Sequence, residues 1–425
     1  MREMKDSGIE WIGEIPKDWD ILRLKYCFSG FANGTSDTQL NSGESFYPVT
    51  RIETISSGEI NLDKIGYVAF CKKQYLLKTG DILVSNINSI KYLGNCAVVR
   101  DGYKLYHGMN LLRIVPSDYI DKGYAYYLFK SNVLKFPMEK YCKPAINQAS
   151  VSATTMKNFF IPFPAFVKQQ QIANFLDTKC SEINATAEDI QKEISLLEDY
   201  KKSVITEAVT KGLNPDAETK DSGIEWVGKV PATWKIMPNK YIMTKKKVIK
   251  EVYEGESIIS LSMNGVIVRD LEAGGKMPKT FDGYQIVYPG NLLMCLFDYD
   301  VTPRCIGLIK DYGVTSPAYS QFVMNNGNYS GYYYYYYLMV DHTKALLHLA
   351  KNLRHSFTEE QLGAILAPVP TIEEQQQIAD YLDTKCSEID AIIADKKRQL
   401  DILADYKKSL IYEYVTGKKE VPVHE

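Results

Sequence analysis

The side chains that most often catalyse reactions or bind metals are scattered through this sequence rather than grouped. Its 425 residues include five histidines and eight cysteines, none of them in a spacing typical of a metal site. The chain lacks the glycine-rich phosphate loop ending in Gly-Lys-Ser or Gly-Lys-Thr, the His-Glu-x-x-His motif and the Gly-x-Ser-x-Gly motif. Carboxylates are common, but their context distinguishes no pair. The pattern favours a binding protein without catalytic activity, and it predicts neither a metal nor a cofactor.

Composition and charge narrow the setting of the protein. The chain is 45% hydrophobic and 24% charged, and no apolar run is long enough to span a bilayer. The opening MREMKDSGIE has no apolar segment behind its charges, so we expect no signal peptide. Eight cysteines without a Cys-x-x-Cys pair favour a reduced, cytoplasmic location. The net charge of −2 neither requires nor excludes nucleic acid, so contact with DNA would need local basic patches or a basic partner.

Two phrases occur twice in the chain. KDSGIEWIG at Lys5–Gly13 returns as KDSGIEWVG at Lys220–Gly228, 215 residues later. QQQIANFLDTKCSEI at Gln169–Ile183 returns as QQQIADYLDTKCSEI at Gln375–Ile389, 206 residues later. The two copies therefore share their ends and differ in the length of their middles. This pattern predicts an internal duplication in which one module has diverged.

The repeated tail has the periodicity of a long helix. Residues at alternating steps of four and three form a stripe in the first copy, at Leu176, Cys180, Ile183, Ala187, Ile190, Ile194, Leu197, Lys201, Val204 and Ala208. The second copy has the matching stripe at Leu382, Cys386, Ile389, Ile393, Lys396, Leu400, Leu403, Lys407, Leu410 and Tyr414. Such a stripe predicts a coiled coil. A proline-bearing stretch precedes each helix, and Gly212 and Gly417 are placed as C-terminal caps.

Connectivity predicts that the two helices are antiparallel. The first leads from one globular head to the second, and the other must run back if the two pair. Roughly 44 residues at about 1.5 Å each give a rod of about 65 Å. Two unrelated surface helices are the alternative, but matched heptads at a fixed repeat favour one shared seam. We expect an α+β protein with pseudo-twofold symmetry, divided into a first head with its joint segment (1–165), a first helix (166–212), a second head (213–371), a second helix (372–417) and a tail (418–425).

The heads have the pattern of short strands separated by turns. GDILVSNI, GNCAVVRDG and NLLRIV indicate strands in the first head, and ESIISLSMNGVIV, GNLLMCLF and CIGLIKDYG indicate strands in the second. TGDIL against PGNLL, and VVRDG against LIKDY, predict a common fold. The run of six tyrosines at Tyr332–Tyr337 lies where the first head has GYAYYLFKS, so we expect one helix flanking each sheet. Tyrosines that stack on bases are the alternative interpretation of that run.

The duplicated KDSGIEWIGEIPKDW phrase, the Pro-x-Pro stretch before EQQQIADYLD and the heptad helix after each variable head resemble the specificity subunit of a type I restriction–modification enzyme. The resemblance extends over essentially the whole chain, and Asn352–Asp383 is close to the family pattern. The first copy departs from that pattern at Lys168, where the second has Glu374, and at Ala145–Ser152, which replaces the Arg354–His355 version.

The resemblance implies two target-recognition domains that each read one half of a bipartite, asymmetric DNA sequence, with the coiled coil setting the spacer. It implies two methyltransferase subunits that modify one adenine in each half-site, and two motor–nuclease subunits that join for restriction. Half-sites read from one face of DNA lie about 34–36 Å apart, which suits heads on a rigid rod. Two alternatives are a self-sufficient DNA-modifying enzyme with unrecognised motifs and a structural scaffold.

Base edges are read by Arg or Lys on guanine and by Asn or Gln on adenine. The candidates lie in polar loops beside the predicted strands: Asn86, Asn88, Lys91, Asn110, Lys143, Asn147 and Gln148 in the first head, and Asp298, Arg304, Ser320, Gln321, Asn352, Arg354 and His355 in the second. A solvated loop residue is the alternative for each. The cluster Lys245, Lys246 and Lys247 is a candidate phosphate contact or an ordinary exposed turn. The polar start of each long helix either faces the methyltransferase or simply favours a helix N-terminus.

The repeated phrase itself predicts a contact. We expect Ile9, Trp11 and Ile12 to pack against the end of the second helix, near Lys408–Gly417. Ile224, Trp226 and Val227 would pack against the first helix in the same way.

Overall fold

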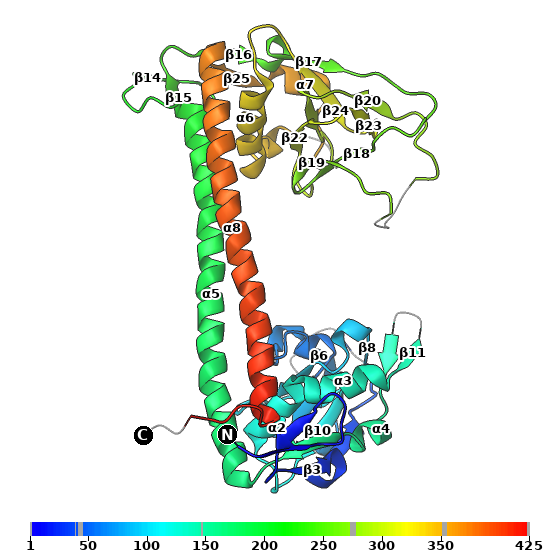
Figure 1. The fold of residues 1–425 in the computed structure, drawn as a ribbon. Helices are drawn as coiled ribbons and strands as arrows, with labels where there is room; N and C mark the ends of the chain where they lie inside the picture. The colour runs from blue at the N-terminus through cyan, green and yellow to red at the C-terminus, as the bar shows by residue number, and fades with distance from the viewer. Residues whose placement is uncertain are drawn as a thin grey trace. The chain divides into compact units, whose positions relative to one another are not determined.

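The computed structural model describes residues 2–38, 40, 46–145, 148–272, 278–350 and 355–422. The chain divides into two compact units, one formed by Met1–Ile190 with Arg398–Glu425 and the other by Gln191–Lys397. Each unit contains one head and a part of each long helix (Figure 1). Within the described residues, no helix is both long and apolar enough to cross a membrane.

The two long helices, α5 (Phe166–Lys211) and α8 (Ile372–Val415), run side by side within each unit (Figure 1). In the first unit the rings of Phe175 and Tyr414 lie 4.5 Å apart, and Lys407 Nζ donates to Asn184 Oδ1 at 2.7 Å. In the second unit Lys201 Nζ donates to Asp390 Oδ2 at 2.6 Å, and Lys396 pairs with Glu193. The residue numbers of each pair sum to 589 or 591. The helices are therefore antiparallel, as predicted.

The predicted seam is confirmed by burial. Every stripe position is buried or half-buried, while most of the residues between them are exposed. Leu176, Leu382 and Ile194 lie deepest, and the stripe lysines are half-buried. These lysines bury their apolar stems and extend their ammonium groups to polar groups on the facing helix.

The first head is built on a four-stranded antiparallel sheet in the order β4-β10-β7-β9. Its central strand β7 is apolar and buried throughout, because α2 and α3 pack on one face of the sheet and the loop cluster around Ile55 packs on the other. The elements of the first head are β1 (Met4–Asp6), β2 (Glu14–Pro16), β3 (Asp20–Arg23), α1 (Leu24–Cys27), β4 (Phe28–Asn33), β5 (Tyr47–Val49), β6 (Gly66–Val68), β7 (Ile82–Val84), β8 (Ile87–Asn88), β9 (Cys96–Val98), β10 (Leu112–Pro116), α2 (Lys122–Lys130), α3 (Asn132–Lys140), β11 (Lys143–Ala145), β12 (Gln148–Ser150), α4 (Ala153–Lys157) and β13 (Phe160–Phe163).

The second head repeats this sheet in the order β17-β24-β21-β22, which confirms the predicted common fold. Two further two-stranded sheets, β18-β19 and β20-β23, accompany it. The elements of the second head are β14 (Thr219–Asp221), β15 (Lys229–Pro231), β16 (Lys235–Pro238), β17 (Met243–Lys246), β18 (Ile259–Ser262), β19 (Gly265–Val268), β20 (Gln285–Val287), β21 (Leu292–Met294), β22 (Ile306–Leu308), β23 (Gly313–Thr315), β24 (Ser320–Met324), α6 (Ser330–His342), α7 (Glu359–Ala364) and β25 (Leu366–Val369).

The run of tyrosines forms helix α6, the counterpart of α2. Tyr332, Tyr333 and Tyr335–Tyr337 are buried, and Tyr334 is half-buried. Tyr332 donates to Val209 O at 2.9 Å, just as Tyr124 of α2 donates to Val415 O at 3.0 Å. Buried rings cannot stack on bases, so the tyrosine run packs the head against the long helices.

The repeated phrase forms the predicted joint in both units. It folds into the hairpins β1-β2 and β14-β15. In the first unit the Tyr412 hydroxyl donates to Trp11 O at 2.7 Å, and Ile12 is buried in the same core as Ile411. In the second unit Trp226 and Val227 pack on the core that contains Ile205 and Val209 of α5. The expected packing of the phrase against the helix end is therefore confirmed in the first unit, and in the second unit Trp226 and Val227 belong to the same core as the end of α5.

Candidate nucleic-acid interface

Four of the predicted DNA-contacting residues of the first head gather around one small sheet, β11-β12-β8 (Figure 1). Asn88 pairs with Ala149 in this sheet, next to exposed Gln148, and β11 carries exposed Lys143. Lys91 follows β8 in a short 3-10 helix, Ile90–Tyr92, and is exposed as well. The sheet therefore brings together residues that are more than 50 positions apart in sequence.

Two of these residues give the surface a positive charge. Within the part of the chain that the structure describes, no carboxylate forms an ion pair with Lys91 or Lys143. The Lys91 ammonium lies 5.4 Å from the centre of the Tyr92 ring. Unpaired lysines beside an exposed aromatic ring can contact phosphates or guanine edges without first breaking an ion pair.

Asn86 corrects one of the predictions. It is buried, and its Nδ2 donates to Val151 O at 3.0 Å, while Val151 N donates to Asn86 O at 2.9 Å. The side chain therefore holds the loop after β7 against the segment before α4 and cannot reach a base. Asn110 is exposed in the turn before β10 and is not part of the small sheet. Asn147 lies outside the described residues.

In the second head, Asp298 and Arg304 lie in the loop between β21 and β22, and His355 contacts the same loop. His355 O accepts from Tyr299 N at 3.3 Å, and His355 Nδ1 lies 3.0 Å from Asp300 Oδ2. Arg304 donates to Tyr334 Oη at 2.6 Å and to Met263 O at 3.2 Å. Arg304 is therefore already engaged in shaping the loop, which leaves fewer of its donors for an incoming ligand.

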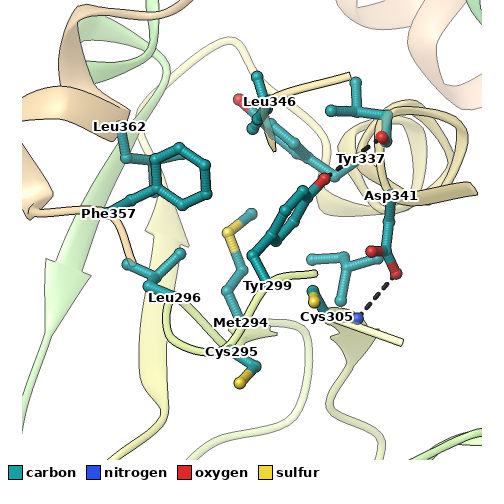
Figure 2. A pocket seen from close by; sticks show the side chains of 12 residues that line it. Met294, Cys295, Leu296, Tyr299, Cys305, Tyr337, Asp341, Leu346, Phe357 and Leu362 are labelled. Atoms are coloured by element: carbon teal, nitrogen blue, oxygen red, sulfur yellow. Dashed lines mark hydrogen bonds between the residues drawn. The ribbon is translucent and has the colours of Figure 1, made fainter. Parts of the chain in front are cut away.

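Buried residues anchor both ends of this loop, as Figure 2 shows. The Tyr299 ring packs edge-on against Phe357 at 5.3 Å, and its hydroxyl donates to Val340 O at 3.3 Å. At the other end Cys305 N donates to the Asp341 carboxylate at 2.7 Å. The cavity behind the loop has a volume of about 30 Å³, which has room for only a few water molecules and is too small for a substrate.

The chemistry of this cavity also argues against catalysis. Burial raises the pKa of the Cys305 thiol well above its ordinary range, and the nearby Asp341 carboxylate raises it further. Burial likewise raises the pKa of the Cys295 thiol. Both sulfurs therefore stay protonated and are poor nucleophiles. Among the described residues, no group of three or more His, Cys, Asp or Glu side chains could hold a metal ion.

Ser320 and Gln321 are corrections as well, because both are buried in β24. Gln321 Oε1 accepts from Tyr288 N at 2.9 Å and from Asn291 Nδ2 at 2.8 Å, and its Nε2 donates to Ile286 O at 3.1 Å. The residue type of Gln321 predicts a surface position, whereas its side chain satisfies buried polar groups inside the head. Asn352 and Arg354 lie outside the described residues.

The lysine cluster of β17 is mostly engaged within the second head. Lys245 pairs with Glu359, and the Lys246 ammonium lies 3.7 Å from the centre of the Tyr288 ring. Lys247 is exposed. Lys247 is therefore the member of the cluster best placed to contact a phosphate.

Four exposed loop residues were not predicted: Ile90, Tyr92, Asp300 and Val301. Three of them are apolar or aromatic, so they do not have the residue types that hydrogen-bond to base edges. A signal for these residues was present in the sequence. The strands TGDIL and VVRDG of the first head align with PGNLL and LIKDY of the second, and the segments between them have the same length, which indicates a shared loop.

The fold and these surfaces define a protein made of two copies of one unit, each offering an exposed polar surface at the same place on its sheet. Residues 16–196 match the family described as type I restriction modification DNA specificity domain. The putative type I restriction enzyme MjaX specificity subunit of Methanocaldococcus jannaschii is 30% identical over 424 residues, covering 96% of each chain. The MjaVIII specificity subunit of the same organism is 23% identical, covering 96% of this chain and 94% of its own.

A solved chain from work on the complex assembly and conformational transition of the type I R-M system has a similar fold, with a TM-score of 0.70 at 12% identity, covering 95% of this chain and 99% of that one. The chain belongs to the specificity subunits of type I restriction enzymes. It is the DNA-sequence recognition subunit of such an enzyme and is not itself the catalyst.

Proposed function

We propose that each head of this subunit contacts one half of a bipartite DNA target. The observation that carries the proposal is the gathering of Lys91, Lys143 and Gln148 in the first head, and of Asp298, Asp300 and His355 in the second, beside equivalent strands of the same sheet. Exposed donors and acceptors on a rigid support are what base-edge recognition requires. Asn88, Asn110, Lys247 and Arg304 remain in the proposed contact set as residues that shape or flank these surfaces.

We propose that two methyltransferase subunits dock on the long helices, one in each unit. Leu196 and Tyr200 are exposed on α5 in the second unit, and their repeat equivalents Ile402 and Tyr406 are exposed on α8 in the first. Large apolar side chains held in water at equivalent positions suit two copies of one partner. Two motor–nuclease subunits would join this complex for restriction.

The docking proposal is tested by the stoichiometry of the complex. Tyr200→Ala together with Leu196→Ala is expected to reduce the number of bound methyltransferase subunits from two to one, as measured by native mass spectrometry. The equivalent changes at Tyr406 and Ile402 should do the same, and the four changes together should abolish the complex. Substituting the exposed Lys192 and Lys397 with alanine is the control. Retention of both partners by the fourfold variant would overturn the proposal.

We further propose that the paired helices set the spacer between the half-sites. Residues that face each other on the two helices have numbers that sum to about 590, so a deletion in one helix must be matched by a deletion of the facing segment in the other. The matched segments are 187–193 and 397–403. This double deletion removes one heptad from each helix and keeps the register of the rest. A map of methylated adenines should then show a shorter spacer and unchanged half-sites. Changed half-sites with the original spacer would contradict the proposal.

The recognition role itself is tested by reconstituting the chain with its methyltransferase subunits and mapping methylated adenines genome-wide. A bipartite motif that disappears when this chain is omitted is the expected result. Calorimetric titration of the isolated chain with S-adenosylmethionine should show no binding, since stoichiometric binding would favour a self-sufficient enzyme. A scaffold without a recognition role predicts that changes in the head loops leave the motif unaltered.

The DNA target and the free state of all eight cysteines support a cytoplasmic location. Fractionation of the native host, followed by detection of the chain with its DNA, tests that location.

A further inference from the structure

The two heads carry the same hairpin loop with different sequences. In the first head residues 85–95 connect β7 to β9, and in the second head residues 295–305 connect β21 to β22, so both loops have 11 residues. Ser85 N donates to Asn95 O at 2.8 Å, and Cys295 N donates to Cys305 O at 2.8 Å. The base of the loop is therefore closed by the same hydrogen bond in both heads.

A second shared hydrogen bond fixes the side of each loop. Val151 N donates to Asn86 O at 2.9 Å in the first head, and Phe357 N donates to Leu296 O at 2.8 Å in the second. Each bond joins the second residue of the loop to the segment that precedes α4 or α7. The scaffold that holds the loop is thus duplicated, although Asn86 and Leu296 differ in chemistry.

The residues at the tips of the two loops share neither identity nor charge. The first tip exposes Ile90, Lys91 and Tyr92, with Ile90 56% exposed. The second exposes Asp300 and Val301, with Val301 73% exposed. These exposed side chains are largely free of packing within the described part of each head and are therefore available to contact a ligand outside the chain.

The second loop is also held in a strained conformation. Three non-glycine residues among those described have positive φ, at Asp298 (48°), Lys344 (48°) and His355 (43°). Asp298 is half-buried and lies two residues before exposed Asp300, Lys344 Nζ donates to Thr302 O at 2.8 Å, and His355 contacts Asp300. Strain of this kind persists where the surrounding structure fixes a functional geometry. All three strained residues converge on a single loop.

We propose that the tips of these two loops are the elements that set the sequence of each half-site. Lys91 donates to the O6 and N7 atoms of a guanine in the half-site of the first head. Asp300 accepts from N4 of a cytosine in the other half-site, and Val301 contacts the methyl group of an adjacent thymine. This inference rests on the proposed function, because it assigns the base contacts within that recognition role.

The charges of the two loop tips fit these assignments. Lys91 is a cation without a carboxylate partner among the described residues, as a guanine contact requires. Asp300 is held on one oxygen by His355, and no described side chain occupies its second oxygen. A carboxylate repels the phosphates of DNA, so exposed Asp300 cannot raise the general affinity for DNA. It can instead select a base that presents an amino group.

The test uses the complete complex with its methyltransferase subunits and compares single variants by adenine methylation mapping. Lys91→Ala should relax one guanine position of the first half-site, with about a 5- to 150-fold loss of discrimination there, and should leave the second half-site unchanged. Lys91→Arg should keep the preference for guanine, because arginine also donates to O6 and N7. Lys104→Ala, which removes another exposed lysine of the same head, should alter neither half-site.

In the second head, Asp300→Asn should shift one position of the other half-site from cytosine toward adenine, because an amide pairs with N6 and N7. Val301→Ala should weaken the neighbouring preference for thymine. Replacing residues 86–94 with the sequence of 296–304 should give both half-sites the base preference of the second head at this position.

The outcomes separate this inference from the function on which it rests. If Lys91→Ala and Asp300→Asn methylate the wild-type sequence with wild-type discrimination, the loop assignment is overturned while DNA recognition stands. A loop exchange that leaves both half-sites as they were overturns it independently of any single contact. A wild-type complex that methylates no defined sequence would instead contradict the proposed function. Circular dichroism of each variant confirms that its fold is intact.

Discussion

The Tyr127 hydroxyl donates a hydrogen bond to Asp177 Oδ1 at 2.7 Å, and Tyr335 donates to Asp383 Oδ1 in the same way at 2.6 Å. In each unit the tyrosine lies on the helix of the head and the aspartate lies on a long helix. Burial raises the pKa of both tyrosines, and the hydrogen-bonded aspartate raises it further, so both hydroxyls remain donors. The duplication therefore preserved the attachment of head to helix along with the phrases that are visible in the sequence.

Tyr127→Phe is expected to lower the free energy of unfolding of the first unit by about 1 kcal/mol, because Asp177 is exposed and water can replace the lost donor. Tyr335→Phe should cost a similar amount in the second unit. Urea denaturation measures both. Tyr119→Phe, at a tyrosine that is 76% exposed, is the control and should be neutral. A larger effect at Tyr119 than at Tyr127 would contradict the attachment.

The first glutamine of each repeated QQQ triplet is fully buried. Gln375 Oε1 accepts from Tyr329 N at 2.7 Å, and its Nε2 donates to Pro370 O at 3.0 Å. Gln375→Leu should destabilise the second unit by about 3 kcal/mol, because it leaves a buried donor and a buried acceptor without partners. Gln376→Leu makes the same change at the exposed neighbour and should stay within about 0.5 kcal/mol of wild type in the same denaturation experiment.

In the first unit Gln169 makes the equivalent bonds, to Asp121 N at 2.8 Å and to Pro164 O at 2.9 Å. Gln169→Leu and Gln170→Leu therefore repeat the comparison independently. Equal losses at the buried and the exposed glutamine of either pair would show that helix propensity, and not the buried hydrogen bonds, governs the effect.

Gly417 ends α8 with φ of 71°, and a Cβ there would lie 2.5 Å from the Pro16 ring. Gly417→Ala should therefore cost more than Gly8→Ala, where φ is 69° and nothing lies within 4 Å of the added atom. The left-handed backbone alone costs about 1 kcal/mol at either site, and overpacking adds about 1–3 kcal/mol at Gly417. Thermal denaturation of the two variants gives the comparison. Equal melting temperatures would place Pro16 away from the helix end.

His107 makes the stability of the first head depend on pH. Burial lowers its pKa to about 4, while its ring nitrogen Nε2 lies 3.0 Å from Leu111 O and donates to it. Because the unfolded chain binds the proton near pH 6.5, stability is complete above that pH and is lost as the pH falls toward 4. Between pH 7 and pH 5 the wild type should lose about 2 kcal/mol more than His107→Gln, which keeps a donor but does not titrate. Parallel pH profiles of urea stability would contradict this account.

The departure at Lys168 has a structural consequence. In the second unit Trp234 Nε1 donates to Glu374 Oε1 at 3.3 Å. In the first unit Lys168 stands in place of that glutamate and pairs with Glu420 of the tail at 3.3 Å. The buried Trp19 Nε1 consequently has no hydrogen-bond partner among the described residues. The difference between Glu374 and Lys168 therefore replaces a hydrogen bond to tryptophan in the second unit by an ion pair with Glu420 in the first.

Much of the fold could be predicted because its signals are local or periodic. The seven-residue stripe identifies the seam, since only positions repeating every 3.5 residues can face a partner helix continuously. The glycines at 212 and 417 mark the helix ends because that backbone turn excludes a side chain. The repeated KDSGIEWIG phrase predicted a shared joint, since identical sequences in a duplicated chain pack against identical surroundings.

The recognition surface was predictable only in part. Asn86, Ser320 and Gln321 have the residue types of base readers, yet all three are buried, and the heads use Asn86 and Gln321 to satisfy buried polar groups. Asp300 and Val301 were missed because nothing local distinguishes an exposed loop tip from a buried one. Sequence by itself determined the duplication, the coiled coil, the joints and the family, because each is written in repeats and periodicity. The tertiary structure alone decided which loop side chains reach solvent and which residue of α5 pairs with which residue of α8, because these depend on contacts between segments far apart in the chain.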